Sequence, residues 1–178
     1  MDKVNFLNVQ VITPWSQESM CSKLTPGGNS SIAAPTSAAY PEANLAIYVP
    51  FFVVAPMVVD QLFCFNGATV SGNVDIGIYD AGKRRVVSTG STAQSGVNTI
   101  QAVNVADTTI GPGLFFVALA MDNTTGTLTA SGTGLAAYLA ANGIYQQASA
   151  FALPVTATFA APTRDYIPLF GLTSRSLI

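Results

Sequence analysis

Hydrophobic residues recur in short runs over the middle of this 178-residue chain, and glycine, asparagine, aspartate or proline separates the runs. This spacing is typical of β-strands joined by tight turns. Strands about ten residues apart predict a jelly-roll-like antiparallel β-sandwich, and they argue against a parallel sheet with crossover helices. The strands are predicted over residues 45–54, 58–65, 74–79, 85–92, 99–105, 114–121 and 125–130.

Two of these runs predict where strands lie in the sandwich. Residues 74–79 alternate, which places Val74, Ile76 and Ile78 on the core face. Residues 114–119 are apolar on both faces, as in a central strand that is covered on both sides. The covered outer side indicates a second surface beyond the sandwich core.

Turn residues and proline divide the rest of the chain. Asn66-Gly67 and residues 71–73 tolerate positive φ, and residues 80–83 predict a hairpin turn. Residues 135–142 predict one short helix, which Asn142-Gly143 ends. Further strands are expected over residues 148–161 and 166–172, separated by prolines.

The N-terminal part has weak periodicity. Residues 4–12 are compatible with one strand, and residues 16–43 predict an extended arm or long loop that orders against a neighbour, with simple disorder as the alternative. The predicted organisation is therefore an N-terminal arm over residues 1–43 and a β-sandwich domain over residues 44–178. Deletion of residues 1–43 is expected to leave a folded domain that no longer joins its assembly.

Composition makes association a central expectation. Only 9% of the residues are charged, whereas an ordinary domain has about 25%, and mean hydropathy is +0.43. So few charges do not cover the surface of a monomer of this size. A chain of this kind is expected to bury its outside against copies of itself or a larger assembly.

The sequence offers little for catalysis or metal binding. It contains no histidine, which removes the commonest general base and most zinc and iron sites. The carboxylates Asp75, Asp80, Asp107 and Asp122 lie near predicted strand ends, where turn formation explains them better than a glycosidase pair. Asp122-Asn123 and Asp80 are candidates for calcium, but they lack a recognised spacing. We predict no enzyme, no catalytic, cofactor-binding or metal-binding residue, and no cofactor.

Other common functions also lack support in the sequence. Net charge is −2, and the basic run 83–85 fits a solvated turn better than a nucleic-acid contact. Residues 45–59 are interrupted by Pro50 and Pro56 and are shorter than the roughly 20 residues of a spanning helix. The N-terminus lacks the features of a signal peptide. Cys64 is expected to be a buried small hydrophobe, and Cys21 is too distant in sequence to suggest a metal site.

Aromatic residues leave a carbohydrate-binding alternative open. An exposed cluster could stack on the apolar face of a sugar, although core or interface positions are more common for such residues. The candidate residues are Trp15, Tyr40, Tyr79, Tyr138 and Tyr145.

Several segments together resemble small β-rich virion proteins of tailed bacteriophages. They are residues 47–51, 66–80 (NGATVSGNVDIGIYD), 88–92 (STGST) and 111–115 (GPGLF). The likeness covers about residues 45–122 and includes no catalytic motif, so it transfers no functional residue. It implies a virion structural component, a jelly-roll-like sandwich present in multiple copies.

The expected function is therefore that of a capsid decoration (cement) or head-fibre subunit, made in the host cytoplasm and located in the virion. Its partners would be itself, as a homo-oligomer that includes the option of a trimer, and other virion proteins such as the major capsid protein. Neither nucleic-acid binding nor membrane insertion is expected. Residues 1–43 and 166–178 are the expected contact segments. The alternative is a tail-associated module that adheres to host-surface carbohydrate.

Overall fold

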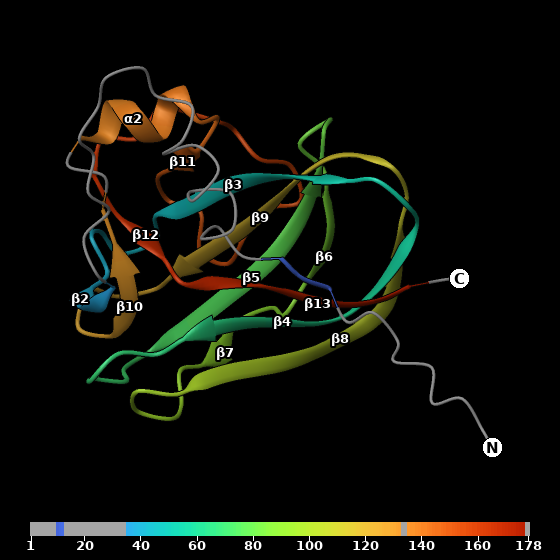
Figure 1. The fold of residues 1–178 in the computed structure, drawn as a ribbon. Helices are drawn as coiled ribbons and strands as arrows, with labels where there is room; N and C mark the ends of the chain where they lie inside the picture. The colour runs from blue at the N-terminus through green and yellow to red at the C-terminus, as the bar shows by residue number, and fades with distance from the viewer. Residues whose placement is uncertain (1–9, 13–34, 133–134, 177–178) are drawn as a thin grey trace.

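The computed structural model of the protein describes residues 10–12, 35–132 and 135–176. Within these residues the chain forms an antiparallel β-sandwich with one short helix, which confirms the fold class predicted from sequence (Figure 1). Two larger sheets enclose the main core, and a third sheet of short strands lies at one end. The first sheet has the order β1 (Gln10–Ile12), β13 (Phe170–Ser176), β4 (Met57–Phe65) and β8 (Ile100–Ile110).

The second large sheet contains the most deeply buried strands. Its centre is β9 (Gly113–Met121), which pairs with β3 (Ala46–Val53) on one side and with β5 (Asn73–Asp80) on the other. On the side of β5 that faces away from β9, β6 (Arg85–Ser88) pairs with the second half of β5. The short strand β7 (Thr92–Ala93) pairs with the first two residues of β5 on the same side. The order is β11 (Tyr145–Gln147), β3, β9, β5 and β6.

The third sheet brings part of the expected arm into the fold. Its order is β12 (Ile167–Pro168), β10 (Thr127–Ser131) and β2 (Thr36–Ala39). Directly after β2, the Tyr40 side chain is 1% exposed and belongs to the main core. Residues 36–43 are therefore part of the packed domain, so the expected boundary at residue 43 comes too late. Of the rest of the expected arm, only β1 lies within the described residues.

The main core confirms the predicted face of β5. Val74, Ile76 and Ile78 are fully buried between the large sheets. On β9, Val117 and Leu119 contribute to the same core. Cys64 is also fully buried there, as predicted, and burial raises the pKa of its thiol to about 12.

The outer face of the second large sheet is covered by the chain itself. Residues 148–161, which we call the cover segment, cross this face, and Ala150, Leu153 and Ala157 pack on Phe116 and Ala118. The two-sided apolar character of β9 is thus explained within one chain. Over Phe116 and Ala118 the second surface inferred from residues 114–119 is therefore internal, whereas Leu114 at the start of β9 stays 41% exposed.

The strand expected over residues 148–161 is wrong. The cover segment makes only isolated bridges, Arg84 with Thr156 at the β6 edge and Gln146 with Ala160 at the β11 edge. A segment that crosses the strands beneath it cannot form a continuous ladder with them. Its apolar residues reflect burial against a sheet face, a signal that resembles that of a strand.

Other predicted elements differ in their boundaries. The expected strand 85–92 is divided between β6 and β7, because Gly90 turns the chain at φ +65. The expected strand 99–105 continues to Ile110, and 166–172 is divided into β12 and β13. The helix is confirmed as α2 (Ala136–Ala141), followed by Asn142 and by Gly143 at φ +72. The predicted strand 4–12 is described only at β1.

Candidate functional site

The four carboxylates considered for catalysis do not converge. Asp75 and Asp80 point to opposite faces of β5 by strand alternation, Asp107 lies on β8 in the other large sheet, and Asp122 follows β9. Among the described residues, no group of three or more acidic or cysteine side chains could hold a metal ion. The structure therefore assembles no acid–base pair from these candidates.

Asp75 is a structural carboxylate beneath the cover segment. Its side chain is fully buried, and Oδ2 accepts a hydrogen bond from the Leu153 backbone N–H at 3.0 Å. Oδ1 accepts one from the Thr89 hydroxyl at 3.3 Å. Burial raises the pKa of Asp75, and the hydrogen bonds together with the nearby Arg85 charge offset only part of this effect.

The raised pKa of Asp75 predicts a distinct pH dependence of stability. Above the pKa that Asp75 has in the folded protein, its carboxylate is charged in both the folded and the unfolded state. Between the unfolded and the folded pKa values, the folded state binds more protons than the unfolded state. The free energy of unfolding of the protein therefore rises as pH falls through this range. We expect the stability of wild type relative to Asp75→Asn to increase as pH falls through that window. Urea unfolding of both proteins at several pH values measures this difference. A relative stability that decreases on acidification would contradict the assignment.

The side chains of the calcium candidates Asp122, Asn123 and Asp80 form hydrogen bonds that stabilise turns, and they do not converge on an open site. Asp122 accepts hydrogen bonds from the Asn73 backbone at 2.9 Å and from the Asn73 side chain at 2.7 Å, and Asn123 Oδ1 accepts from the Gly126 N–H at 2.8 Å. Burial alone would raise the pKa of Asp122, but these hydrogen bonds and one from Asn123 outweigh it and lower the pKa. Asp80 Oδ1 accepts from the Arg84 N–H at 2.9 Å within the predicted hairpin turn. Turn formation accounts for all three residues.

The basic run has a structural role that sequence reasoning did not identify. Lys83 Nζ lies 4.9 Å from the centre of the Phe159 ring, and the Arg85 guanidinium donates a hydrogen bond to the Leu153 carbonyl. The Arg85 backbone N–H also donates to the Val155 carbonyl at 2.8 Å. These residues hold the cover segment against the sheet. No local pattern signals these contacts, because they join residues about seventy positions apart.

The Asn66-Gly67 turn contains a buried amide network. Asn66 is fully buried, donates to the Ser95 carbonyl at 2.6 Å, and accepts from Gln94 Nε2 at 3.0 Å. Gly67 is required by close approach, since a Cβ there would lie 2.3 Å from Ser37 Oγ. The network stabilises the junction between β4, β10 and the segment before β8, and its amide groups have partners within the protein.

The aromatic candidates do not form an exposed binding platform in the described part of the chain. Tyr40 and Tyr79 are buried, and Tyr145 stacks on Phe159 with ring centres 4.7 Å apart. Tyr138 on α2 is 41% exposed. Trp15 lies outside the described residues. The described candidates therefore do not form the arrangement expected of a carbohydrate adhesion module.

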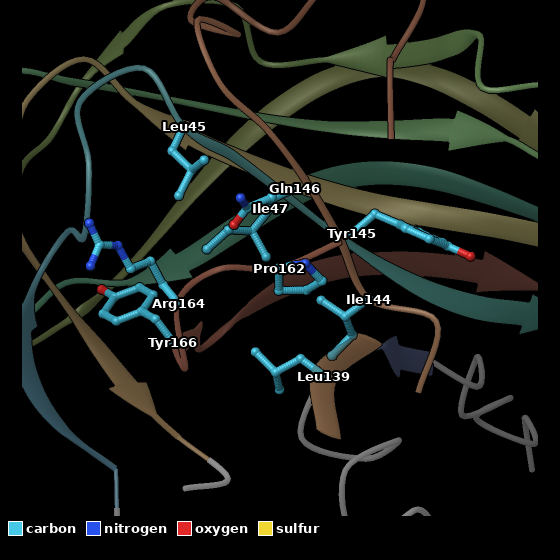
Figure 2. A pocket seen from close by; sticks show the side chains of 9 residues that line it. All are labelled: Leu45, Ile47, Leu139, Ile144, Tyr145, Gln146, Pro162, Arg164 and Tyr166. Carbon is cyan, nitrogen blue, oxygen red and sulfur yellow. The ribbon is translucent and has the colours of Figure 1, made fainter. Parts of the chain in front are cut away.

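A small cavity lies between α2, β3 and the chain before β12. Figure 2 shows Leu139, Ile144 and Pro162 on one side of it, with Arg164 and Tyr166 on another. Its volume is about 10 Å³, which is about the space of one water molecule. The full lining is Leu45, Ile47, Leu139, Ile144, Tyr145, Gln146, Pro162, Arg164 and Tyr166. The cavity is too small for an organic ligand.

The strongest candidate functional surface is an exposed apolar group at one end of the sandwich. Phe52 is 65% exposed, and it pairs across the strands with Leu114, which is 41% exposed. Val54, in the turn that follows β3, is 79% exposed. We call these three residues the apolar end. A contiguous group of large apolar side chains on the surface is typical of a contact with another macromolecule.

The first part of the expected contact segment 166–178 is buried in the domain. Tyr166, Ile167, Phe170 and Leu172 are at most 9% exposed and belong to the main core. Residues 166–172 therefore stabilise the domain instead of presenting a surface. Pro168 and Gly171 interrupt the apolar pattern of this segment, so the sequence predicts a strand here without placing it in the core.

Comparison with known proteins gives no assignment. No protein-family model matches the sequence, and no curated protein is similar to it. In the described part of the chain, no helix is long and apolar enough to cross a membrane.

Proposed function

We propose that the protein is a structural subunit of a tailed-phage particle, acting as a capsid decoration (cement) or head-fibre subunit through contacts with its own copies and with other virion proteins. The observation that carries this proposal is the apolar end formed by Phe52, Val54 and Leu114. Burial of such residues at an interface contributes about 25 cal/mol per Å² of apolar surface, which is a binding function that needs no reaction. The low charge content and the resemblance of residues 45–122 to virion proteins support the same proposal.

Immunogold electron microscopy of intact particles tests the proposal and locates the protein. Gold distributed over the head is the expected result for a decoration or head-fibre subunit. Gold confined to the tail tip would instead favour the carbohydrate adhesion alternative, which glycan arrays would then examine. Particles without label, from cells shown by immunoblot to contain the protein, would overturn the proposal.

A double substitution tests the role of the apolar end. Phe52→Ser with Leu114→Ser should change the free energy of unfolding by no more than about 1 kcal/mol, because both side chains are substantially exposed. Incorporation into particles should fall about tenfold or more, since the lost burial at an interface exceeds about 1.4 kcal/mol. Quantitative immunoblotting of purified particles gives the measurement.

Val97→Ser provides the matched control for this experiment. Val97 is 50% exposed and lies in the loop before β8, where the neighbouring Asn98 N–H donates to the Gly67 carbonyl, past the end of β4 that is opposite to the apolar end. Its replacement should leave incorporation unchanged. Equal incorporation of the double variant and wild type would show that the apolar end is not a contact.

A further inference from the structure

Strand β8 leaves one long edge of the sandwich unpaired within the described residues. It is 11 residues long and pairs with β4 on one side, and no described residue continues the sheet on the other (Figure 1). An unpaired edge presents backbone N–H and C=O groups to which another strand can bind. The edge of β8 is therefore a candidate interaction surface.

The edge strands of the other two sheets are either bridged by the cover segment or very short. The cover segment bridges the β6 edge of the second large sheet through Arg84 and Thr156, and it bridges the β11 edge through Gln146 and Ala160. The edge strands of the third sheet, β2 and β12, have only four and two residues. Short or covered edges are the usual protection against strand addition. Among the described residues, strand β8 is neither short nor covered, and its only interruption is the irregular pairing with β4 between Asn104 and Thr108.

The sequence of β8 also lacks residues that discourage pairing. IQAVNVADTTI contains no proline, lysine or arginine, and Asp107 is its single charge. Lysine, proline and inward-pointing charges are the common devices that prevent edge-to-edge association. The exposed side chains on its outer face include the small residues Ala102 and Ala106, with Asn104 between them. Small, uncharged side chains at these positions leave room for the side chains of a strand that is added at this edge.

The composition of β8 is complementary to itself in one antiparallel register. If Asn104 lies opposite Asn104 of a second copy, Ala102 faces Ala106, and Val103 faces Val105. Asp107 lies where the ladder between β8 and β4 is irregular and is the single charge of β8, so this register opposes no like charges. Moving the centre to Val105 would place Asp107 opposite Val103, and moving it to Val103 would place Asn104 opposite Ala102. Over residues 102–106, the register centred on Asn104 matches polar with polar and apolar with apolar residues.

We propose that β8 pairs antiparallel with β8 of a second copy of this chain, with Asn104 on the two-fold axis. A two-fold contact uses the same surface on both subunits and closes on itself, so both exposed edges are paired at once. The two four-stranded sheets then become one continuous sheet. The inference rests on the proposed function, which requires contacts between copies, and it specifies a dimer, whereas the sequence left a trimer as one option.

Charge substitutions at Ala102 and Ala106 test both the pairing and its register in the full-length chain. Each residue faces the other across the proposed axis, so Ala102→Lys with Ala106→Glu creates opposite-charge pairs. Ala102→Lys with Ala106→Lys creates like-charge pairs at the same positions. Both alanines are exposed in β8, so the variants differ in charge pairing and not in buried volume.

Sedimentation equilibrium of the purified proteins should give a dimer for wild type and for the Lys/Glu variant. The dissociation constant of the Lys/Lys variant should rise about tenfold or more relative to the Lys/Glu variant, because two cross-strand pairs change from attractive to repulsive. The reversed variant, Ala102→Glu with Ala106→Lys, should behave like the Lys/Glu variant. Circular dichroism verifies that all the variants are folded.

A monomeric wild-type protein, or equal dissociation constants for the Lys/Lys and Lys/Glu variants, would overturn the inference. A crosslink provides a second measurement that does not depend on charge. In a Cys21→Ser background, Asn104→Cys should form a covalent dimer on oxidation, whereas Ala106→Cys should not, because the introduced thiol would lie opposite Ala102 of the second copy. Equal crosslinking of the two variants would also overturn the register. Neither measurement depends on particle labelling, so failure of the dimer and failure of the virion proposal are distinguishable.

Discussion

Replacing Tyr40 by alanine should lower the free energy of unfolding of the full-length chain by about 3–5 kcal/mol. The ring is 1% exposed and packs edge-on against Tyr166, with ring centres 5.7 Å apart. Its hydroxyl lies 2.8 Å from the Leu45 carbonyl oxygen and 3.0 Å from that of Leu119, to which it can donate. The substitution therefore removes a buried ring and a buried hydrogen bond together. Urea unfolding followed by circular dichroism measures the change.

Tyr40→Phe is the matched control, because it keeps the ring and removes only the hydroxyl. It should cost about 1–3 kcal/mol, since buried carbonyl groups lose their donor. The expected order of stability is wild type, then Tyr40→Phe, then Tyr40→Ala. A Tyr40→Ala protein within about 1 kcal/mol of wild type would show that this residue does not belong to the core.

The same residue changes what truncation is expected to do. A chain that begins at residue 44 lacks both Tyr40 and strand β2, which pairs with β10. Deletion of residues 1–43 should therefore destabilise the domain itself, contrary to the expectation from sequence. A failure of that truncated protein to enter particles would not by itself demonstrate an assembly arm. Truncation before residue 35 keeps both elements and removes only the edge strand β1 from the described sandwich, so it is the cleaner test of the arm.

Replacing Tyr79 by alanine should cost about 3–5 kcal/mol and loosen the cover segment. The Tyr79 ring is fully buried, and it lies edge-on to Tyr48 with ring centres 5.2 Å apart. Its hydroxyl donates a hydrogen bond of 2.6 Å to the Pro154 carbonyl. Burial raises the pKa of Tyr79 to about 12, so this donor stays protonated at neutral pH. Urea unfolding and limited proteolysis within residues 148–161 provide the two measurements.

Two variants separate the hydrogen bond from general effects of losing a tyrosine. Tyr79→Phe should cost about 1–3 kcal/mol and increase cleavage of the cover segment less than Tyr79→Ala does. Tyr138→Ala, at a side chain that is 41% exposed, should change stability by about 0.5 kcal/mol or less. If Tyr79→Ala neither destabilised the protein nor increased cleavage in residues 148–161, the cover segment would not depend on this anchor.

The central strands were predictable because their signals are local. Val74, Ile76 and Ile78 alternate with residues of the other face, and their burial follows directly from that period. The hairpin turn at Asp80 and the end of α2 at Gly143 follow from residues that favour turns and positive φ. By contrast, the break between β6 and β7 at Gly90 was missed, because the flanking β-rich residues continue the pattern on both sides.

The candidate site was less predictable, because its properties depend on contacts distant in sequence. Asp75 had the appearance of a turn or catalytic carboxylate, but its role is set by Leu153, which donates to it from 78 residues away. The apolar run that forms β9 predicted burial on both faces, but it could not reveal that the chain's own cover segment supplies the second layer. The exposure of Phe52 and Leu114 could not be predicted either, because the sequence of an apolar strand is the same whether its side chains lie in a core or on the surface.

The sequence by itself determined the antiparallel β-sandwich, most of its central strands and the short helix, because side-chain period and turn chemistry act over a few residues. It also determined the lack of histidine and the low charge, which limit the chemistry open to the protein. Only the tertiary structure decided which apolar surfaces are buried and which sheet edges remain unpaired. Those properties depend on where distant segments pack: the cover segment closes one sheet, whereas β8 and the apolar end have no such cover among the described residues.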